Sequence, residues 1–153
     1  MSVTAHRGDK AGMKILFDTS ALLKRYLPES GREAVLRLVA SATAAVAAPH
    51  CKIEIYSALN RVRRETQASD VSYLDTCAEV ERNFSDMQVV PLSASVERYA
   101  IRALQASAMR GMDALHVGAA LAAGVDLFVT ADIRQFNGAQ ALGLKATLLK
   151  DVQ

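Results

Sequence analysis

The stretch KILFDTS, residues 14–20, decides the class of fold. Its first four residues form a short, mostly apolar run, which is typical of a strand buried on both faces. The run stops at Asp18, and a helical pattern begins two residues later, at Ser20. A buried strand that leads at once into a helix is typical of α/β proteins, because parallel strands need helical crossovers between them.

The rest of the chain alternates in the same way. Further helices are predicted for residues 20–26, 29–40, 50–66, 71–84, 93–109 and 112–123, and further strands for residues 44–48, 87–92, 125–129 and 146–149. Gly124 is a C-terminal stop for the helix that precedes it. We therefore predict an α/β layered fold around a mostly parallel sheet.

Two of these helices have a recognisable apolar side. In the helix of residues 50–66, apolar side chains recur at helical spacing, at Cys51, Ile55, Leu59 and Val62. The helix of residues 71–84 is also predicted to be amphipathic, with Leu74, Ala78 and Glu81 on one side.

The composition indicates one globular domain. The chain has 153 residues, of which 51% are hydrophobic and 22% charged, with only 3 Pro and 8 Gly, and this excludes a disordered or fibrous protein. The formal net charge of +2 is too small to hold nucleic acid through the overall field of the protein. Any site for a polyanion must therefore be local.

Several features favour a cytoplasmic protein without a membrane span. Residues 1–12 lack the apolar core of a secretory signal, and we expect them to be a disordered extra segment or tag in front of a single domain, residues 13–150. The most apolar stretch, residues 114–131, is interrupted by His116 and Asp126, which favours a helix, a turn and a strand over a membrane span. Cys51 and Cys77 are too few for a disulfide framework and have no zinc-like spacing.

Four acidic residues occupy unusual positions: Asp18, Glu54, Asp113 and Asp132. Taken singly, each has a structural explanation: Asp18 and Asp113 as helix caps, Glu54 as half of a solvated ion pair, and Asp132 as a turn residue. His116 is expected to be a core histidine. Asp126 precedes its strand and would lie at the opposite edge of the sheet, so we exclude it.

Together the four acids predict a metal site. Asp18 and Asp132 follow strands, and ligand sites of parallel sheets gather at the carboxyl ends of the strands. Asp113 lies in a helix that is otherwise nearly all apolar, where an ionised carboxylate needs a partner. Carboxylates that share a cleft repel one another unless divalent cations neutralise them, and oxygen ligands select Mg²⁺ or Mn²⁺ over Zn²⁺. The simplest use of such a site is phosphoryl transfer, in which a cation activates a water.

The segments MKILFDTSALLKRY, MDALHVGAALAAG and LFVTADIRQF, with Glu54 in a mid-chain helix, resemble the PIN-domain ribonucleases, most of all the VapC-type toxins. The resemblance runs from Met13 to about Lys150. It implies a three-layer α/β/α fold with four or five strands and a Mg²⁺- or Mn²⁺-dependent endoribonuclease. Its catalytic and metal-binding acids would be Asp18, Glu54, Asp113 and Asp132.

The resemblance also implies further site residues and partners. Thr19, Ser20 and Thr130 would be auxiliary hydroxyls, and Asp132 would either bind the cation, hold a water or orient Asp113. The family implies products with a 5′-phosphate and a 3′-hydroxyl, a homodimer, and a VapB-type antitoxin whose tail covers the active cleft.

Substrate RNA would require cations near the acids. The basic residues closest to the motifs are Lys24, Arg25, Lys52, Arg61, Arg110 and Arg134. Contacts from such residues to phosphates position RNA without reading its sequence. Aromatic residues make up only 5% of the chain, so extended base stacking is not predicted.

Our hypothesis is an RNA phosphodiester hydrolase in which Asp18 and Asp113 are the principal metal ligands and Glu54 binds a metal directly or through water. One alternative is a binding or scaffold domain, in which the acids are caps and exposed pairs. Another is a phosphoacceptor receiver domain, which needs an acidic pair after the first strand and a late lysine, here Lys145. A haloacid-dehalogenase-type phosphatase fits less well, because Asp18-Thr-Ser lacks the second acid of the Asp-x-Asp pattern.

Overall fold

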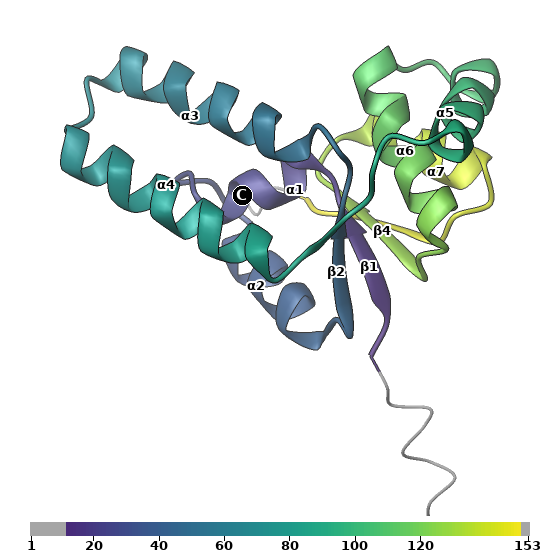
Figure 1. Ribbon diagram of the computed structural model, residues 1–153, viewed down its shortest axis with the longest axis horizontal. Coiled ribbons are helices and arrows are strands. Elements are labelled where there is room, and N and C mark those ends of the chain that lie inside the picture. The colour runs from purple at the N-terminus through teal and green to yellow at the C-terminus, as the bar shows by residue number, and fades with distance from the viewer. Residues whose placement is uncertain (1–11, 151–153) are drawn as a thin grey trace, which may run out of the picture.

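The computed structural model describes residues 12–150 (Figure 1). The expectation that residues 1–12 are a disordered extra segment or tag therefore falls, except for residue 12, outside the described residues. The strands are β1 (Lys14–Phe17), β2 (Ala44–Ala47), β3 (Gln88–Val89), β4 (Leu127–Thr130) and β5 (Ala146–Leu148). The helices are α1 (Thr19–Leu22), the 3₁₀ helix η2 (Leu23–Arg25), α2 (Arg32–Ser41), α3 (Cys51–Thr66), α4 (Asp70–Ser85), α5 (Ala94–Ala106), α6 (Gly111–Ala123) and α7 (Ile133–Ala141).

All five strands form one parallel sheet in the order β3-β2-β1-β4-β5. The central strand is β1, in which Ile15 lies opposite Ala45 of β2 and Leu127 of β4. The predicted parallel α/β fold is therefore confirmed, and the sheet is parallel throughout.

Helices cover both faces of the sheet (Figure 1). Side chains alternate along β1, so that Ile15 and Phe17 pack in a core with α1–α4 while Leu16 packs in a second core with α5–α7. Both cores are made of side chains that are almost completely buried. The result is a three-layer α/β/α architecture. In the described part of the chain, no helix combines the length and the apolar character that a membrane span needs.

Several elements differ from the prediction: α5 ends three residues early, β4 begins two residues late, and larger differences concern α2, β3 and α7. Helix α2 begins three residues late, because Gly31 at its N-cap adopts a left-handed backbone with φ of 93°. Strand β3 is only two residues long, and both of its residues are exposed at the edge of the sheet. Helix α7 was not predicted from the periodicity, although Asp132 in front of it accepts a hydrogen bond from the backbone N–H of Arg134.

The packed side of α4 also differs from the prediction. Leu74, Ala78 and Glu81 are exposed, whereas Val80 and Phe84 are buried. The side that packs against α3 includes Tyr73, whose hydroxyl exchanges hydrogen bonds with the side-chain amide of Asn60. The side of α4 that faces the core is therefore formed by Tyr73, Val80 and Phe84, and not by Leu74 and Ala78.

The topology places four helix N-termini near one edge of the sheet. Helices α1, α3 and α7 each follow a strand, β1, β2 and β4, so they begin at the carboxyl edge. Helix α6 ends at Gly124 and leads into the start of β4, so its own N-terminus points back toward that edge. The side chains at these four N-termini are thereby brought close together.

Candidate active site

Each predicted acid lies at the beginning of one of these four helices. Asp18 is the N-cap of α1 and Asp132 is the N-cap of α7, while Glu54 and Asp113 lie in the first turns of α3 and α6. Helix N-termini carry a partial positive charge, which favours carboxylates there. For Asp18 and Asp132, the position that caps a helix is also a position at this edge of the sheet. Capping and a role in a polar site are therefore not competing explanations.

Asp18 is buried, with 1% of its surface exposed. Its Oδ1 accepts hydrogen bonds from the Ala21 N–H at 2.9 Å and the Ser20 hydroxyl at 2.7 Å, and its Oδ2 accepts one from the Thr130 hydroxyl at 2.5 Å. Burial raises the pKa of the Asp18 carboxyl, while the nearby His116 and the three hydrogen bonds oppose that rise. No salt bridge reaches Asp18 within the described residues, so its charge lacks a cationic partner in contact.

Glu54 is half-buried and is held by two hydrogen-bond donors, with His50 close by. Its Oε1 accepts hydrogen bonds from the Thr19 hydroxyl at 2.7 Å and from His116 Nε2 at 2.8 Å, and His50 Nε2 lies 3.3 Å away. Burial alone would raise the pKa of Glu54, but the hydrogen bonds from His116 and Thr19 lower the pKa below its ordinary value. Among the described residues, no arginine or lysine forms an ion pair with Glu54, and its two ion-pair distances are to His50 and His116.

Two histidines connect α3 with α6. Their rings lie with centroids 4.3 Å apart, and His50 Nε2 lies 2.8 Å from the carbonyl oxygen of Met112, next to Asp113. His116 is as buried as a core residue, with 1% exposed, but it is not only a packing residue because its Nε2 reaches Glu54. Desolvation lowers the pKa of His50, and the proximity of His116 lowers it further.

Asp113 and Asp132 both relate to α7. Gln135 Nε2 of α7 lies 3.4 Å from Asp113 Oδ1, and Asp132 Oδ1 accepts a hydrogen bond from the N–H of Arg134 at 2.8 Å. The N–H of Asp132 also donates to the Thr130 hydroxyl at 2.9 Å, which in turn donates to Asp18. The backbone of Asp132 is therefore linked to Asp18 through the Thr130 hydroxyl, while its carboxylate caps its own helix.

The predicted hydroxyl residues all lie within this network. Thr19 contacts Glu54, and Thr130 joins Asp18 to Asp132. Ser20 donates to Asp18 and accepts a hydrogen bond from the Ala131 N–H at 2.9 Å, so it links α1 to the end of β4. The structure thus connects the turns after β1 and β4 through side chains.

The predicted basic residues are placed less uniformly. Arg110 is the N-cap of α6, Arg134 lies in the first turn of α7, and Arg61 is exposed on α3. Lys24 is buried and donates to the Ser30 carbonyl, and Lys52 pairs with Glu81 at 2.5 Å. Arg25 lines a hollow with residues 42–45 at the beginning of β2, at the edge of the sheet opposite Asp18. Arg110 and Arg134 therefore lie at the beginnings of α6 and α7, which carry Asp113 and Asp132, and Lys52 lies in the first turn of α3, which carries Glu54.

Two other residues lie away from the acids. Asp126 accepts a hydrogen bond from the Lys14 N–H at 2.8 Å, at the amino end of β1, as expected for the opposite edge. Lys145 precedes β5 and is likewise at an amino end. A receiver domain would need this lysine near Asp18, so the structure gives that alternative no support.

The residues fit a hard divalent cation. Asp18 is a buried carboxylate without a cationic side chain in contact, and Glu54 keeps a third of its side chain exposed, with one oxygen free of hydrogen bonds from the described residues. Among the described residues, the one group of three possible ligand atoms within 4.8 Å of one another comes from His50, Glu54 and His116, so it includes Glu54 but not Asp18, Asp113 or Asp132. The sequence prediction did not include these histidines in the site, although His50 is one helical turn before Glu54 and His116 one turn after Asp113.

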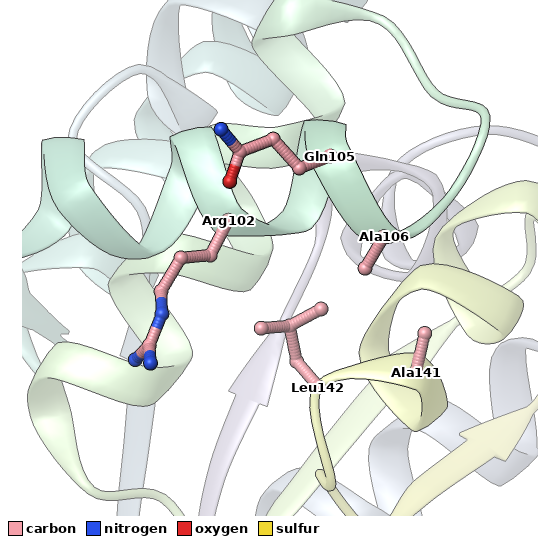
Figure 2. Close-up of a pocket in the computed structure, with 5 residues that line it drawn as sticks. All are labelled: Arg102, Gln105, Ala106, Ala141 and Leu142. Carbon is pink, nitrogen blue, oxygen red and sulfur yellow. The ribbon is translucent and has the colours of Figure 1, made fainter.

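A separate surface hollow of about 460 Å³ lies between α5 and the end of α7 (Figure 2). It is lined by Arg102, Gln105, Ala106, Ala141 and Leu142, and none of the predicted site residues belongs to it. This hollow contains no carboxylate and is not a candidate for the predicted chemistry.

The structure is an α/β/α domain in which helices that begin near the carboxyl edge of a parallel sheet carry the four predicted acids. Residues 15–140 match the PIN domain family, and the chain belongs to this family. It is 31% identical over 133 residues to the protein named Ribonuclease VapC45 of Mycobacterium tuberculosis, a match that covers 86% of this chain and 92% of the relative.

Two solved structures share the fold. One is VapC20 of Mycobacterium tuberculosis, described as a sarcin-ricin loop cleaving toxin, with a TM-score of 0.62, 19% identity and coverage of 81% of this chain and 94% of that one. The other is a toxin–antitoxin complex from Klebsiella pneumoniae, with a TM-score of 0.65, 15% identity and coverage of 91% and 100%. At these identities the likeness concerns the fold alone.

Proposed function

We propose that this protein is a divalent-metal-dependent endoribonuclease and the toxin of a toxin–antitoxin pair. Membership of the PIN-domain family and the similarity to a protein named as a ribonuclease support the reaction class. The observation that carries the proposal is the buried carboxylate of Asp18, connected by one hydroxyl to Asp132 and lying near the histidine that holds Glu54. Capping of α1 alone does not require a carboxylate, because an uncharged Ser or Asn caps equally well without the cost of burying a charge.

Mg²⁺ or Mn²⁺ would be held by Asp18 and Asp113 as principal ligands, by Glu54 directly or through a water, and by Asp132 in the fourth position. When bound, such a cation lowers the pKa of a water and offsets charge on phosphate oxygens. The chain's own residues prepare this site: Ser20 and Thr130 orient the Asp18 carboxylate, and Gln135 contacts Asp113. Arg110 and Arg134, at the beginnings of α6 and α7, would contact RNA phosphates.

The same proposal includes partners and location. The resemblance to VapC-type toxins supports a VapB-type antitoxin, and the likeness to a toxin–antitoxin complex is in keeping with it. We propose a homodimer in the cytoplasm, where the RNA substrate and the antitoxin are both present.

The test is cleavage of total RNA, with mapping of the ends produced, in the presence of Mg²⁺ or Mn²⁺ and again with EDTA. We expect discrete cleavage that EDTA abolishes, with 5′-phosphate and 3′-hydroxyl ends. Asp18→Asn and Asp113→Asn should each lower the rate by at least about 100-fold, since each removes a charged metal ligand. The matched control is Asp126→Asn, which makes the same change at the opposite edge of the sheet and should cleave like the wild type. Wild-type rates for Asp18→Asn or Asp113→Asn would refute the assignment.

A further inference from the structure

We propose that His116, together with Thr19, is a positioning residue for Glu54, and that it holds one carboxylate oxygen so that the other faces the cation. The inference rests on the proposed metal site but not on the identity of the substrate. It gives a role to a buried histidine for which the sequence alone favours packing.

Within the described residues, all hydrogen bonds and ion-pair distances to the Glu54 carboxylate end on the same oxygen, Oε1. Thr19 Oγ1 lies 2.7 Å from Oε1, His116 Nε2 lies 2.8 Å from it, and His50 Nε2 lies 3.3 Å from it. The two donors, Thr19 and His116, come from α1 and α6, so they fix the carboxylate of α3 against two other helices, while His50 Nε2 lies 2.8 Å from the Met112 carbonyl oxygen. The second oxygen, Oε2, is left for a ligand outside the chain.

The hydrogen bonds also indicate which ring nitrogen of His116 carries the proton. A carboxylate only accepts, so the nitrogen that contacts Glu54 must donate, and this is Nε2. The other nitrogen, Nδ1, is buried without a partner among the described residues. If Nε2 instead bound a metal, Nδ1 would carry a buried proton without an acceptor, and orphaned N–H groups are rarer than orphaned acceptors. The geometry therefore favours His116 as a donor to Glu54 over His116 as a metal ligand.

The surroundings of His116 strengthen the argument. Its neighbours Ala114, Val117 and Ala120 are completely buried on the same helix, and a leucine would suit this environment without the cost of burying polar atoms. A fully buried imidazole at this position is therefore accounted for by its bond to Glu54, not by packing.

The test is calorimetric titration with Mn²⁺ of the full chain and of four variants. His116→Leu removes the donor and should weaken Mn²⁺ binding roughly 10- to 100-fold, as is typical when a group that orients a ligand is lost. His116→Gln retains an N–H at a similar reach and should recover most of the affinity. Thr19→Val should weaken binding in the same direction. The control Thr66→Val removes a hydroxyl from α3 about 18 Å from Glu54 along the helix and should have no effect.

A double-mutant cycle decides whether His116 acts through Glu54. In the Glu54→Gln background, His116→Leu should cause little further loss, because the carboxylate that it orients is gone. An equal loss in both backgrounds, or wild-type affinity in His116→Leu, would overturn the proposal. Circular dichroism and thermal unfolding of each variant separate misfolding from loss of the contact. A folded His116→Gln that binds Mn²⁺ no better than His116→Leu would also contradict the positioning role of His116.

Pulsed EPR of the bound Mn²⁺ tests the remaining alternative, that His116 coordinates the metal ion itself. We expect no directly coordinated nitrogen, and a nitrogen coupling that disappears in His116→Gln would make the histidine a ligand and overturn the positioning role. Absence of Mn²⁺ binding to the wild type would overturn the inference outright. RNA cleavage assayed in parallel keeps the two proposals separate: a cycle that behaves as expected in a protein that cleaves no RNA refutes the nuclease alone.

Discussion

Asp18 combines two demands that oppose each other. Its carboxylate caps α1 and accepts three hydrogen bonds, but it is buried and has no cationic side chain in contact among the described residues. A buried charge without a counterion costs stability, whereas a divalent cation would remove the cost. The position of Asp18 therefore favours binding of a cation and lowers the stability of the metal-free protein, which is a common feature of functional sites.

This conflict predicts that Asp18→Asn stabilises the metal-free protein. The pKa of Asp18 is raised above its ordinary value of 3.8 by burial, so ionisation costs folding free energy as the pH rises through the folded pKa. Asparagine keeps the acceptor for Ala21 and Ser20 and carries no charge. In EDTA the melting temperature of the variant should exceed that of the wild type at about pH 8, by about 2–4 °C per kcal/mol gained.

The gain should shrink toward about pH 4, where Asp18 of the wild type is increasingly protonated. Asp126→Asn, at an exposed position, serves as the control and should change little. A variant that melts below the wild type at neutral pH would mean that the ionised carboxylate is not a cost to the metal-free fold.

At the scale of elements, the packing of α5 against α6 depends on Gly118. A Cβ built at this buried glycine would lie 2.6 Å from the Val96 carbonyl oxygen and 2.9 Å from the Ala100 nitrogen, both of which are backbone atoms. The two helices approach closely only because this side chain is absent. The position matters for the site, because α6 carries Asp113 and His116.

Gly118→Ala should therefore destabilise the protein, although alanine favours a helix over glycine by about 1 kcal/mol. Overpacking of this kind costs about 1–3 kcal/mol, which outweighs the gain in helix propensity. Gly111→Ala on the same helix meets no atom within 4 Å and should leave the melting temperature unchanged or raise it. Thermal unfolding of the two variants checks the opposite signs, and a stabilised Gly118→Ala would show that the helices can move apart without cost.

How far the sequence predicts these elements depends on where the local signal lies. The strand at Lys14–Phe17 and the stripe of Cys51, Ile55 and Leu59 are continuous in the sequence, and the structure confirms both. The packed side of α4 was predicted wrongly although Tyr73, Cys77, Val80 and Phe84 recur at helical spacing, because Leu74 and Ala78 offered a second apolar pair on another side. Helix α7 was missed although Asp132 in front of Ile133–Ala141 is an ordinary N-cap signal.

The site shows the same division. Three of the four acids stand out by their positions after strands or within an apolar helix, and the topology brings the elements that carry them to one edge of the sheet. The partnership of Glu54 with His116 spans 62 residues, and no local pattern predicts it. The sequence therefore predicts the four acids as a group, which stays a prediction, but it does not predict the contact between Glu54 and His116.

At the scale of the whole molecule, the five-stranded parallel sheet, covered on both faces, acts as the frame of the site (Figure 1). Segments that begin at residues 18, 51, 111 and 132 meet at its carboxyl edge, and each contributes a carboxylate at a helix N-terminus. The family relationship covers residues 15–140, which include all of these segments. The central claim is that this edge of the sheet holds a divalent cation.

Anomalous diffraction near the manganese absorption edge, from crystals soaked in Mn²⁺, tests this claim most directly. We expect an anomalous peak in contact with carboxylate oxygens of Asp18 and Asp113, and within direct or water-mediated reach of Glu54 Oε2. A protein that binds Mn²⁺ elsewhere, or a site that stays empty at Mn²⁺ concentrations that support RNA cleavage, would contradict it.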